Sequence, residues 1–367
     1  MDVSVQNSGG GSSLRVLQAG RGIAALLVLL HHCATGIVGL PRYWGVDPTG
    51  GAFKFGGAAG VEFFFVLSGF IIAYVHGGDV GRPERAPRYL LRRLLRIYPI
   101  YWFVLAGLVP IYFIAPKLGL GFERNPLDIL SSFTLIHHGI DRTILPAAWT
   151  LYHELLFYLL FLVAIWNRSF GIAVLGGWWL LSLAAVITGP WSFPIVFYSS
   201  PLHLLFGFGM LSCGLVRRAQ LPIPGLLAVL GAVLFFGAGL LENRGWVLAN
   251  RDAQALIYGA GSALMVTGLV RLEQLQRLPI PPLLTALGDA SYSIYLIHFP
   301  VMSLLAKLIF ALHLGSMLPG WAGFLIIALS AALIGLAFYR YVEAPLLKHL
   351  NRRFLPRRKA GPATGDV

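Results

Sequence analysis

Arg21 and His32 place two ionisable side chains inside a strongly apolar segment, residues 18–38. They are eleven residues apart, and at 100° per residue this spacing sets both on one face of a helix, about 16 Å apart along its axis. A charge at the centre of a bilayer costs on the order of 3 kcal/mol, so an ionisable residue kept there usually has a function. Histidine exchanges protons near neutral pH, and arginine binds anions. The pair therefore predicts a functional site along one channel inside a membrane.

The elements that must hold this pair are membrane-spanning helices. Hydrophobic residues make up 57% of the 367 residues and charged residues only 12%, and the mean hydropathy is +0.74. This composition has too few polar side chains to solvate an ordinary soluble globule. Apolar runs of about 20 residues, enough to cross a hydrocarbon core of roughly 30 Å, recur at 18–38, 56–76, 97–115, 148–166, 171–188, 195–216, 223–241, 253–270, 288–312 and 320–341. The sequence predicts an all-α, polytopic membrane helical bundle of about ten transmembrane helices, with 126–138 as a candidate interfacial or re-entrant helix.

Basic residues are divided unevenly between the two sides of this predicted bundle. One side carries 20 Lys and Arg residues, including those of 82–96 and 340–359, and the other side carries 7. The positive-inside rule makes the richer side cytoplasmic, and an even number of spans then places both termini there. The net charge of +13 thus reflects topology, and no nucleic-acid partner is expected. We expect a flexible cytoplasmic tail over 1–14, a transmembrane domain over 15–346, and a basic cytoplasmic tail over 347–367 that either lies against membrane lipid or serves only as a topology anchor.

Six short segments are more informative together than singly. They are LQAGRGIAALLVLLHH, GGAAGVEFFFVLSGFI, RRLLRIYPIYW, WTLYHELLFYL, LGDASYSIYLIHFPV and YRYVEAPL. In this order they resemble the acyltransferase 3 family of bacterial membrane acyltransferases, from about residue 15 to residue 346. The family's pattern of an Arg, ten intervening residues and a His is met by Arg21 and His32. The opening LQAGRGIAALL, with Gln18 where many members carry Asp, is similar to the branch that modifies exopolysaccharides.

The resemblance implies an enzyme of the bacterial cytoplasmic (inner) membrane. It would transfer an acyl group, usually acetyl, from a cytoplasmic donor such as acetyl-CoA to a carbohydrate hydroxyl. The acceptor would be an exopolysaccharide, another surface glycan or a lipid-linked precursor. Acyl-CoA would be a substrate, and we expect no permanently bound cofactor and no metal. A sugar hydroxyl is a poor nucleophile, so His32 is the predicted general base. Arg21 would hold a donor phosphate or stabilise developing negative charge.

Glu154, in the segment WTLYHELLFYL, is the third predicted catalytic residue. A carboxylate within a span is costly unless it is paired. We expect it to orient the imidazole of His32 or to bind an acceptor hydroxyl, while a salt bridge between helices would also account for it. Tyr295 and His298 are three residues apart in LGDASYSIYLIHFPV. They are predicted to line an acceptor or acyl pocket, although such residues also serve helix packing.

Arg92, Arg93 and Arg96 form the predicted binding site for the donor. In a helix these positions lie within one turn of each other, so their guanidinium groups would gather along one side. Guanidinium groups suit bidentate contacts with phosphate, and acyl-CoA carries several phosphates. A positive-inside anchor that touches lipid headgroups would explain the same three residues.

A glycolipid transporter or flippase is the alternative function for the whole chain. Buried Arg, His and Glu residues also build substrate pathways and proton relays in transporters. The two functions differ in their product. An acyltransferase adds one acyl mass to a glycan, whereas a transporter moves the glycan unchanged.

Overall fold

The computed structural model describes residues 14–53, 58–139, 142–189, 191–218, 221–246 and 250–355. Within these ranges the regular secondary structure is helical, and no strand occurs. Ten segments are long and apolar enough to cross a membrane: Arg15–Val38, Gly60–Asp79, Pro83–Ile114, Pro146–Trp166, Arg168–Thr188, Ile195–Arg218, Pro224–Asn243, Arg251–Gln274, Ser291–Ala311 and Gly320–Phe354. The predicted all-α bundle of about ten transmembrane helices is confirmed.

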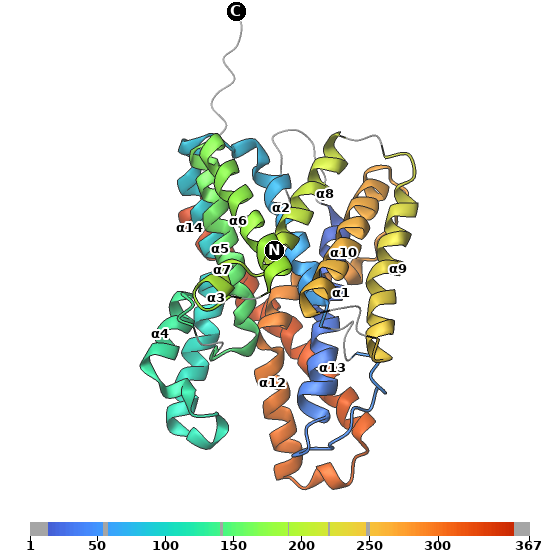
Figure 1. The fold of residues 1–367 in the computed structure, drawn as a ribbon. Helices are drawn as coiled ribbons and strands as arrows, with labels where there is room; N and C mark the ends of the chain where they lie inside the picture. Colours follow the sequence, from blue (N-terminus) through green and yellow to red (C-terminus); the bar gives the residue numbers. More distant parts are fainter. Residues whose placement is uncertain are drawn as a thin grey trace, which may run out of the picture.

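The helices stack side by side into one bundle (Figure 1). In chain order the α-helices are α1 (Arg15–Cys33), α2 (Gly60–His76), α3 (Ala86–Ile114), α4 (Pro126–Thr134), α5 (Trp149–Trp166), α6 (Arg168–Thr188), α7 (Ile195–Tyr198), α8 (Leu202–Arg218), α9 (Pro224–Asn243), α10 (Arg251–Gln274), α11 (Pro282–Asp289), α12 (Ser291–Ala311), α13 (Gly320–Phe338) and α14 (Ala344–Phe354). Two π-helical segments continue them: η1 (Ala34–Val38) follows α1, and η8 (Tyr339–Glu343) joins α13 to α14.

Helix α1 lies inside the bundle, which explains why its polar residues are not exposed to lipid. It packs against α2, α10, α11, α12 and α13. One apolar cluster joins α1, α12 and α13, and a second is built mainly from α3 and α5, with smaller contributions from α2, α6 and α8. Helix α12 contributes side chains to both clusters, so it runs between the two halves of the core. The polar groups described below lie at this boundary.

Glycine allows two of the helices to approach at backbone distance. A Cβ atom on Gly69 of α2 would come within 2.0 Å of the carbonyl oxygen of Phe206 in α8. A Cβ atom on Gly209 of α8 would come within 1.8 Å of the carbonyl oxygen of Val66. Small residues at such crossings are a common way for helices to associate in membranes. This contact fixes α2, and with it Ser68, in the interior.

The segment between α3 and α5 does not cross the membrane. It contains the short helices η4 (Pro116–Leu118), η5 (Phe122–Arg124), α4 and η6 (Pro146–Ala148), and it lies at the lower left of Figure 1. The nine residues of α4 extend only about 14 Å, too short for a span. The predicted element at 126–138 is therefore a short helix, which Asn125 caps and which ends at Leu135 with a φ of 55°.

Candidate active site

His32, at the end of α1, is paired with His298 of α12. Nδ1 of His32 lies 2.8 Å from Nε2 of His298, and the two rings stack with centroids 5.1 Å apart. Nδ1 of His298 lies 2.7 Å from the carbonyl oxygen of Tyr295. A carbonyl oxygen can only accept, so Nδ1 of His298 carries a proton and Nε2 of the neutral ring accepts from His32. Nε2 of His32 is then left with a lone pair, which is the atom a general base needs.

His31 and His32 have different surroundings although they are adjacent. Nδ1 of His31 lies 2.9 Å from the carbonyl oxygen of Phe53, whereas Nδ1 of His32 lies against His298 of α12. This difference is what a rotation of 100° per residue produces.

In the described part of the chain, no group of three or more His, Cys, Asp or Glu side chains could hold a metal ion.

Arg21 is buried in α1, with 6% of its surface exposed. It donates from Nη1 to Oε1 of Gln18 at 3.2 Å, and Nε2 of Gln18 donates to Oδ1 of Asp289 at 2.9 Å. Three further charged side chains lie within electrostatic range of its guanidinium group: Arg96 of α3, Glu154 of α5 and Glu343 of η8. We call Arg21, Arg96, Glu154 and Glu343 the charged cluster. Two cations and two anions balance each other there, which makes charge in the interior tolerable.

Glu154 is held by hydroxyl groups on both sides. It accepts hydrogen bonds from Oγ of Ser68, at 3.1 Å, and from the phenol of Tyr158. Among the hydrogen bonds of the described residues, none joins Glu154 to His32. The position expected for Glu154, beside the imidazole of His32, is occupied by His298. Glu154 instead belongs to the charged cluster around Arg21.

The three arginines of the predicted donor site have three different environments. Nη2 of Arg93 lies 2.9 Å from Nε2 of His76, whose Nδ1 lies 2.8 Å from the carboxylate of Asp79. Arg96 turns inward to the charged cluster, and Arg92 is exposed. Arg93 and Arg96 nevertheless both lie within electrostatic range of Tyr158, and Arg92 lies within range of Arg93. The three positions span an arc of about 100° on α3, and their role in donor binding stays a prediction.

Tyr295 connects α12 to α5. Its hydroxyl lies 3.0 Å from Oγ1 of Thr150, and its ring centroid lies 5.9 Å from that of His298. The structure therefore brings both residues of the predicted acceptor pocket to His32. Their observed contacts are with protein groups: Tyr295 holds α5, and His298 holds His32.

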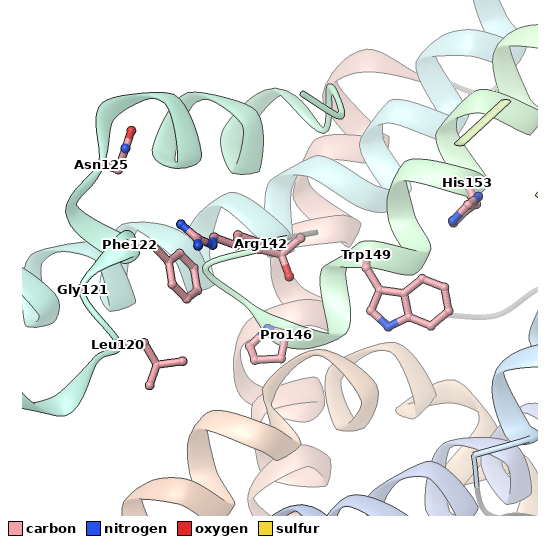
Figure 2. Close-up of a pocket in the computed structure, with 9 residues that line it drawn as sticks. Leu120, Gly121, Phe122, Asn125, Arg142, Pro146, Trp149 and His153 are labelled. Atoms are coloured by element: carbon pink, nitrogen blue, oxygen red, sulfur yellow. The ribbon is translucent and has the colours of Figure 1, made fainter. Parts of the chain in front are cut away.

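A cavity of about 960 Å³ lies where the segment between α3 and α5 meets the first turns of α5. Phe122, Asn125, Arg142, Trp149 and His153 are among its lining residues (Figure 2). The cavity could not be predicted from the sequence, because most of its walls come from irregular segments without hydrophobic periodicity. Trp149 and His153 are one helical turn apart in α5, and this spacing was the available signal.

Known proteins resemble this chain over most of its length. A family model described as an acyltransferase domain matches residues 15–340. Exopolysaccharide production protein ExoZ of Rhizobium meliloti is 32% identical, over 84% of this chain and 95% of its own. Acyltransferase MdmB of Streptomyces mycarofaciens is 26% identical over 85% and 86% of the two chains. Peptidoglycan O-acetyltransferase OatA of Listeria monocytogenes is 23% identical over 80% and 52%. No solved structure matches the chain.

Proposed function

Because the chain belongs to the acyltransferase 3 family, we propose that it moves an acyl group, acetyl in the simplest case, from acyl-CoA to a sugar hydroxyl. The family and the ten apolar helices make the protein an integral membrane acyltransferase. The acceptor we propose is an exopolysaccharide, another surface glycan or a lipid-linked precursor. The names of two relatives support a carbohydrate acceptor, since one concerns exopolysaccharide production and another O-acetylation of peptidoglycan.

The observation that carries this proposal is the hydrogen-bonded pair of His32 and His298. The Tyr295 carbonyl fixes the proton of His298 on Nδ1, and His298 in turn fixes the proton of His32 on Nδ1. Nε2 of His32 can therefore take the proton from an acceptor hydroxyl. When His32 becomes positively charged, the lone pair of His298 stabilises that charge through the same hydrogen bond.

The reaction balances with His32 as the only proton carrier. The acceptor O–H bond breaks as its proton moves to Nε2 of His32, and the oxygen forms a bond to the thioester carbonyl carbon. The C–S bond then breaks, and Nε2 returns the proton to the departing sulfur. The products are an O-acyl sugar and free CoA, and the histidine ends in its starting state.

Arg21 is too far from His32 to stabilise negative charge on the reacting carbonyl. The two residues are about 16 Å apart along α1, and helical side chains lean in the same direction, which preserves that separation. Of the two roles expected for Arg21, we propose the other one, contact with a phosphate or polar group of the donor remote from the thioester. Glu154 and Arg96 then set the charge around that part of the donor.

We propose that the donor reaches the site from the end of the bundle where α3 begins. Arg92 is exposed there, and Arg96 and Arg21 continue the positive charge inward. The excess of basic residues in the loops at this end makes it the cytoplasmic one, where acyl-CoA is found. Both chain termini would lie on this side of the bacterial inner membrane. A lipid-contacting anchor remains the competing role for Arg92 and Arg93.

The function is tested with acyl-CoA labelled in its acyl group and the polysaccharide of cells that lack this protein. We expect inverted membrane vesicles, which expose the cytoplasmic face, to transfer label from external acyl-CoA to polysaccharide enclosed in their lumen, with a gain of one acyl mass by mass spectrometry. Right-side-out vesicles should not use external acyl-CoA. Movement of an unmodified glycan across the vesicle membrane, without a labelled product, would establish the transporter instead.

A further inference from the structure

The cavity beside α5 is preformed by contacts that hold its walls in place. The carboxylate of Glu123 accepts from the backbone N–H groups of Leu120 and Gly121, at 2.9 and 2.8 Å, and closes this turn on itself. Nζ of Lys307 in α12 donates to the carbonyl oxygen of Leu118 at 2.9 Å. Lys307 thus ties the segment that forms the cavity to the helix that carries His298. A preformed site binds without a large cost for ordering its walls.

The lining of the cavity combines aromatic surface with a few polar groups. Trp149 has 39% of its surface exposed although it begins a helix in the bundle interior. The guanidinium group of Arg142 lies 5.8 Å from the centroid of the Phe122 ring. Figure 2 shows Phe122 and Arg142 side by side, with Asn125 beyond them and Trp149 at the opposite end of the same cavity. A flat apolar ring beside hydrogen-bonding groups is the chemistry that recognises a sugar, whose C–H face is apolar and whose edge carries hydroxyls.

The position of the cavity relates it to the proposed active site. Trp149 and His153 line it from one face of α5, and Thr150 and Glu154 lie about 100° further round the same helix. Thr150 contacts Tyr295, whose carbonyl holds His298. One face of α5 therefore lines the cavity, and the adjacent face contacts Tyr295, the residue whose carbonyl holds the histidine pair.

The cavity and the basic end of the bundle lie at opposite membrane faces. Arg93 and Ile114 belong to the same helix, α3, and their separation of 21 positions corresponds to about 32 Å, the thickness of a hydrocarbon core. The cavity lies beyond Ile114, in the segment that follows α3. A ligand in this cavity would approach from the face opposite the donor.

We propose that this cavity binds the acceptor glycan, with the indole of Trp149 stacked on one pyranose ring and Arg142 and Asn125, toward the other end of the cavity, bonded to the hydroxyl groups of further sugar residues. The inference rests on the proposed acyl transfer to a carbohydrate. The volume of about 960 Å³ lies near the upper end of the usual range for ligand pockets, roughly 300–1,000 Å³, and suits an oligosaccharide better than a small metabolite.

Substitutions at Trp149 and Arg142 test the proposal in full-length protein reconstituted in nanodiscs. The probe is the unacylated polysaccharide of cells that lack this protein, cut to oligosaccharides. We expect Trp149→Leu and Arg142→Gln to raise the KM for the oligosaccharide about tenfold. The KM for acyl-CoA and its slow hydrolysis without acceptor should stay unchanged. Trp149→Phe keeps a smaller ring and should give an intermediate KM, which a folding defect would not produce.

Two matched controls come from the same chain. Trp166, at the other end of α5, is 69% exposed, and Arg124 is exposed close to the cavity without lining it. Trp166→Leu and Arg124→Gln should leave both KM values unchanged. If the wild type acylates the oligosaccharide and Trp149→Leu keeps the wild-type KM for it, the glycan site is overturned and the acyltransferase stands.

Direct binding separates this inference from the proposed function. Calorimetry with the same oligosaccharides measures binding whether or not transfer occurs. The wild type could bind the oligosaccharide without transferring an acyl group to it. If Trp149→Leu then weakens this binding about tenfold, the glycan site stands and the proposed acyl transfer is rejected. Absence of binding to the wild type would overturn the glycan site. Equal binding by the variant, with altered dependence of its stability on lipid, would make Trp149 an interfacial lipid anchor and also overturn it.

Discussion

Two histidine pairs in this protein share the same hydrogen bond and differ in ring orientation, with interplanar angles of 15° and 57°, and in their surroundings. His32 with His298 and His153 with His203 each join Nδ1 of the first residue to Nε2 of the second at 2.8 Å. His32 is partly exposed and adjoins the boundary between the two core clusters. His203 is fully buried, and its ring centroid lies 4.4 Å from that of Trp178. The ring centroid of His153 lies 4.9 Å from that of Phe197.

The difference shows that a hydrogen-bonded pair of imidazoles is not by itself a catalytic device. In the first pair, His298 is bonded to the backbone carbonyl of Tyr295, and Nε2 of His32 keeps a lone pair. A proton from the substrate can therefore move to Nε2 of His32. The second pair is enclosed by aromatic rings, which suits two neutral imidazoles that pack and support a wall. His153 does line the cavity, so its lack of a catalytic role can be tested by experiment.

The largest effect is expected at His32. His32→Ala removes the proposed base and should lower the rate of acyl transfer by about 10²- to 10⁴-fold. The measurement is labelled product formed by purified protein at saturating donor and acceptor. His31→Ala is the control and should retain most of the activity. Parent-level activity in His32→Ala would remove the central role of this pair, and a loss matched by loss of folded protein would make it structural.

His298 should have the next largest effect, because it acts through His32. His298→Ala leaves Nδ1 of His32 without its acceptor, and we expect kcat to fall about 10- to 100-fold, as when a residue that orients a reactive group is lost. The KM values for both substrates should change little, which separates positioning from binding. Tyr295→Phe keeps the carbonyl and is the control. A raised acceptor KM with unchanged kcat would instead support the substrate-binding role expected from sequence.

A smaller effect is expected from the two arginines of α3 that are proposed to meet the donor. Arg96→Lys and Arg93→Lys keep the charge and lose the planar fork, so the KM for acyl-CoA should rise up to about tenfold. The acceptor KM should not change. Arg124→Lys, at an exposed position in the segment between α3 and α5, serves as the control. Unchanged donor kinetics in both α3 variants, with normal insertion, would favour the membrane anchor.

The smallest effect on catalysis is expected at the second pair. His153→Phe preserves packing and removes the hydrogen bond to His203, which should destabilise the protein by about 1–3 kcal/mol. The rate at saturating substrate should remain within about threefold of the parent, far from the loss at His32. Thermal unfolding in detergent and the transfer assay measure the two quantities. A rate loss as large as that of His32→Ala would reverse our assignment of the two pairs.

The fold was largely predictable because the bilayer dictates it. A helix of about 20 apolar residues is one of few ways to satisfy the backbone inside lipid, so hydropathy alone locates the spans. Periodicity also placed Arg21 and His32 on one face of α1. It could not say which helix would face them, since His298 follows His32 by 266 residues. Glu154, the more obvious partner by chemistry, contacts Ser68 and Tyr158 instead.

The cavity could not be predicted for a different reason. Its walls depend on backbone groups captured by single side chains, such as the amides held by Glu123 and the Leu118 carbonyl held by Lys307. Such contacts leave no periodic pattern in the sequence. In the sequence, Lys307 is an isolated cation in an apolar run. Its partner, the Leu118 carbonyl, is brought to it only by the position of η4 beside α12.

The atom that fixes the proton of His298 is a main-chain carbonyl, and a main-chain carbonyl cannot be lost by substitution. Every residue type placed at position 295 of α12 brings the same acceptor, so the tautomer of His298 survives change there. The side chain at position 295 can therefore change together with its contacts across the helix interface. In this protein that contact is between Tyr295 and Thr150. Evolution can reshape the neighbourhood of this base without disturbing the base itself.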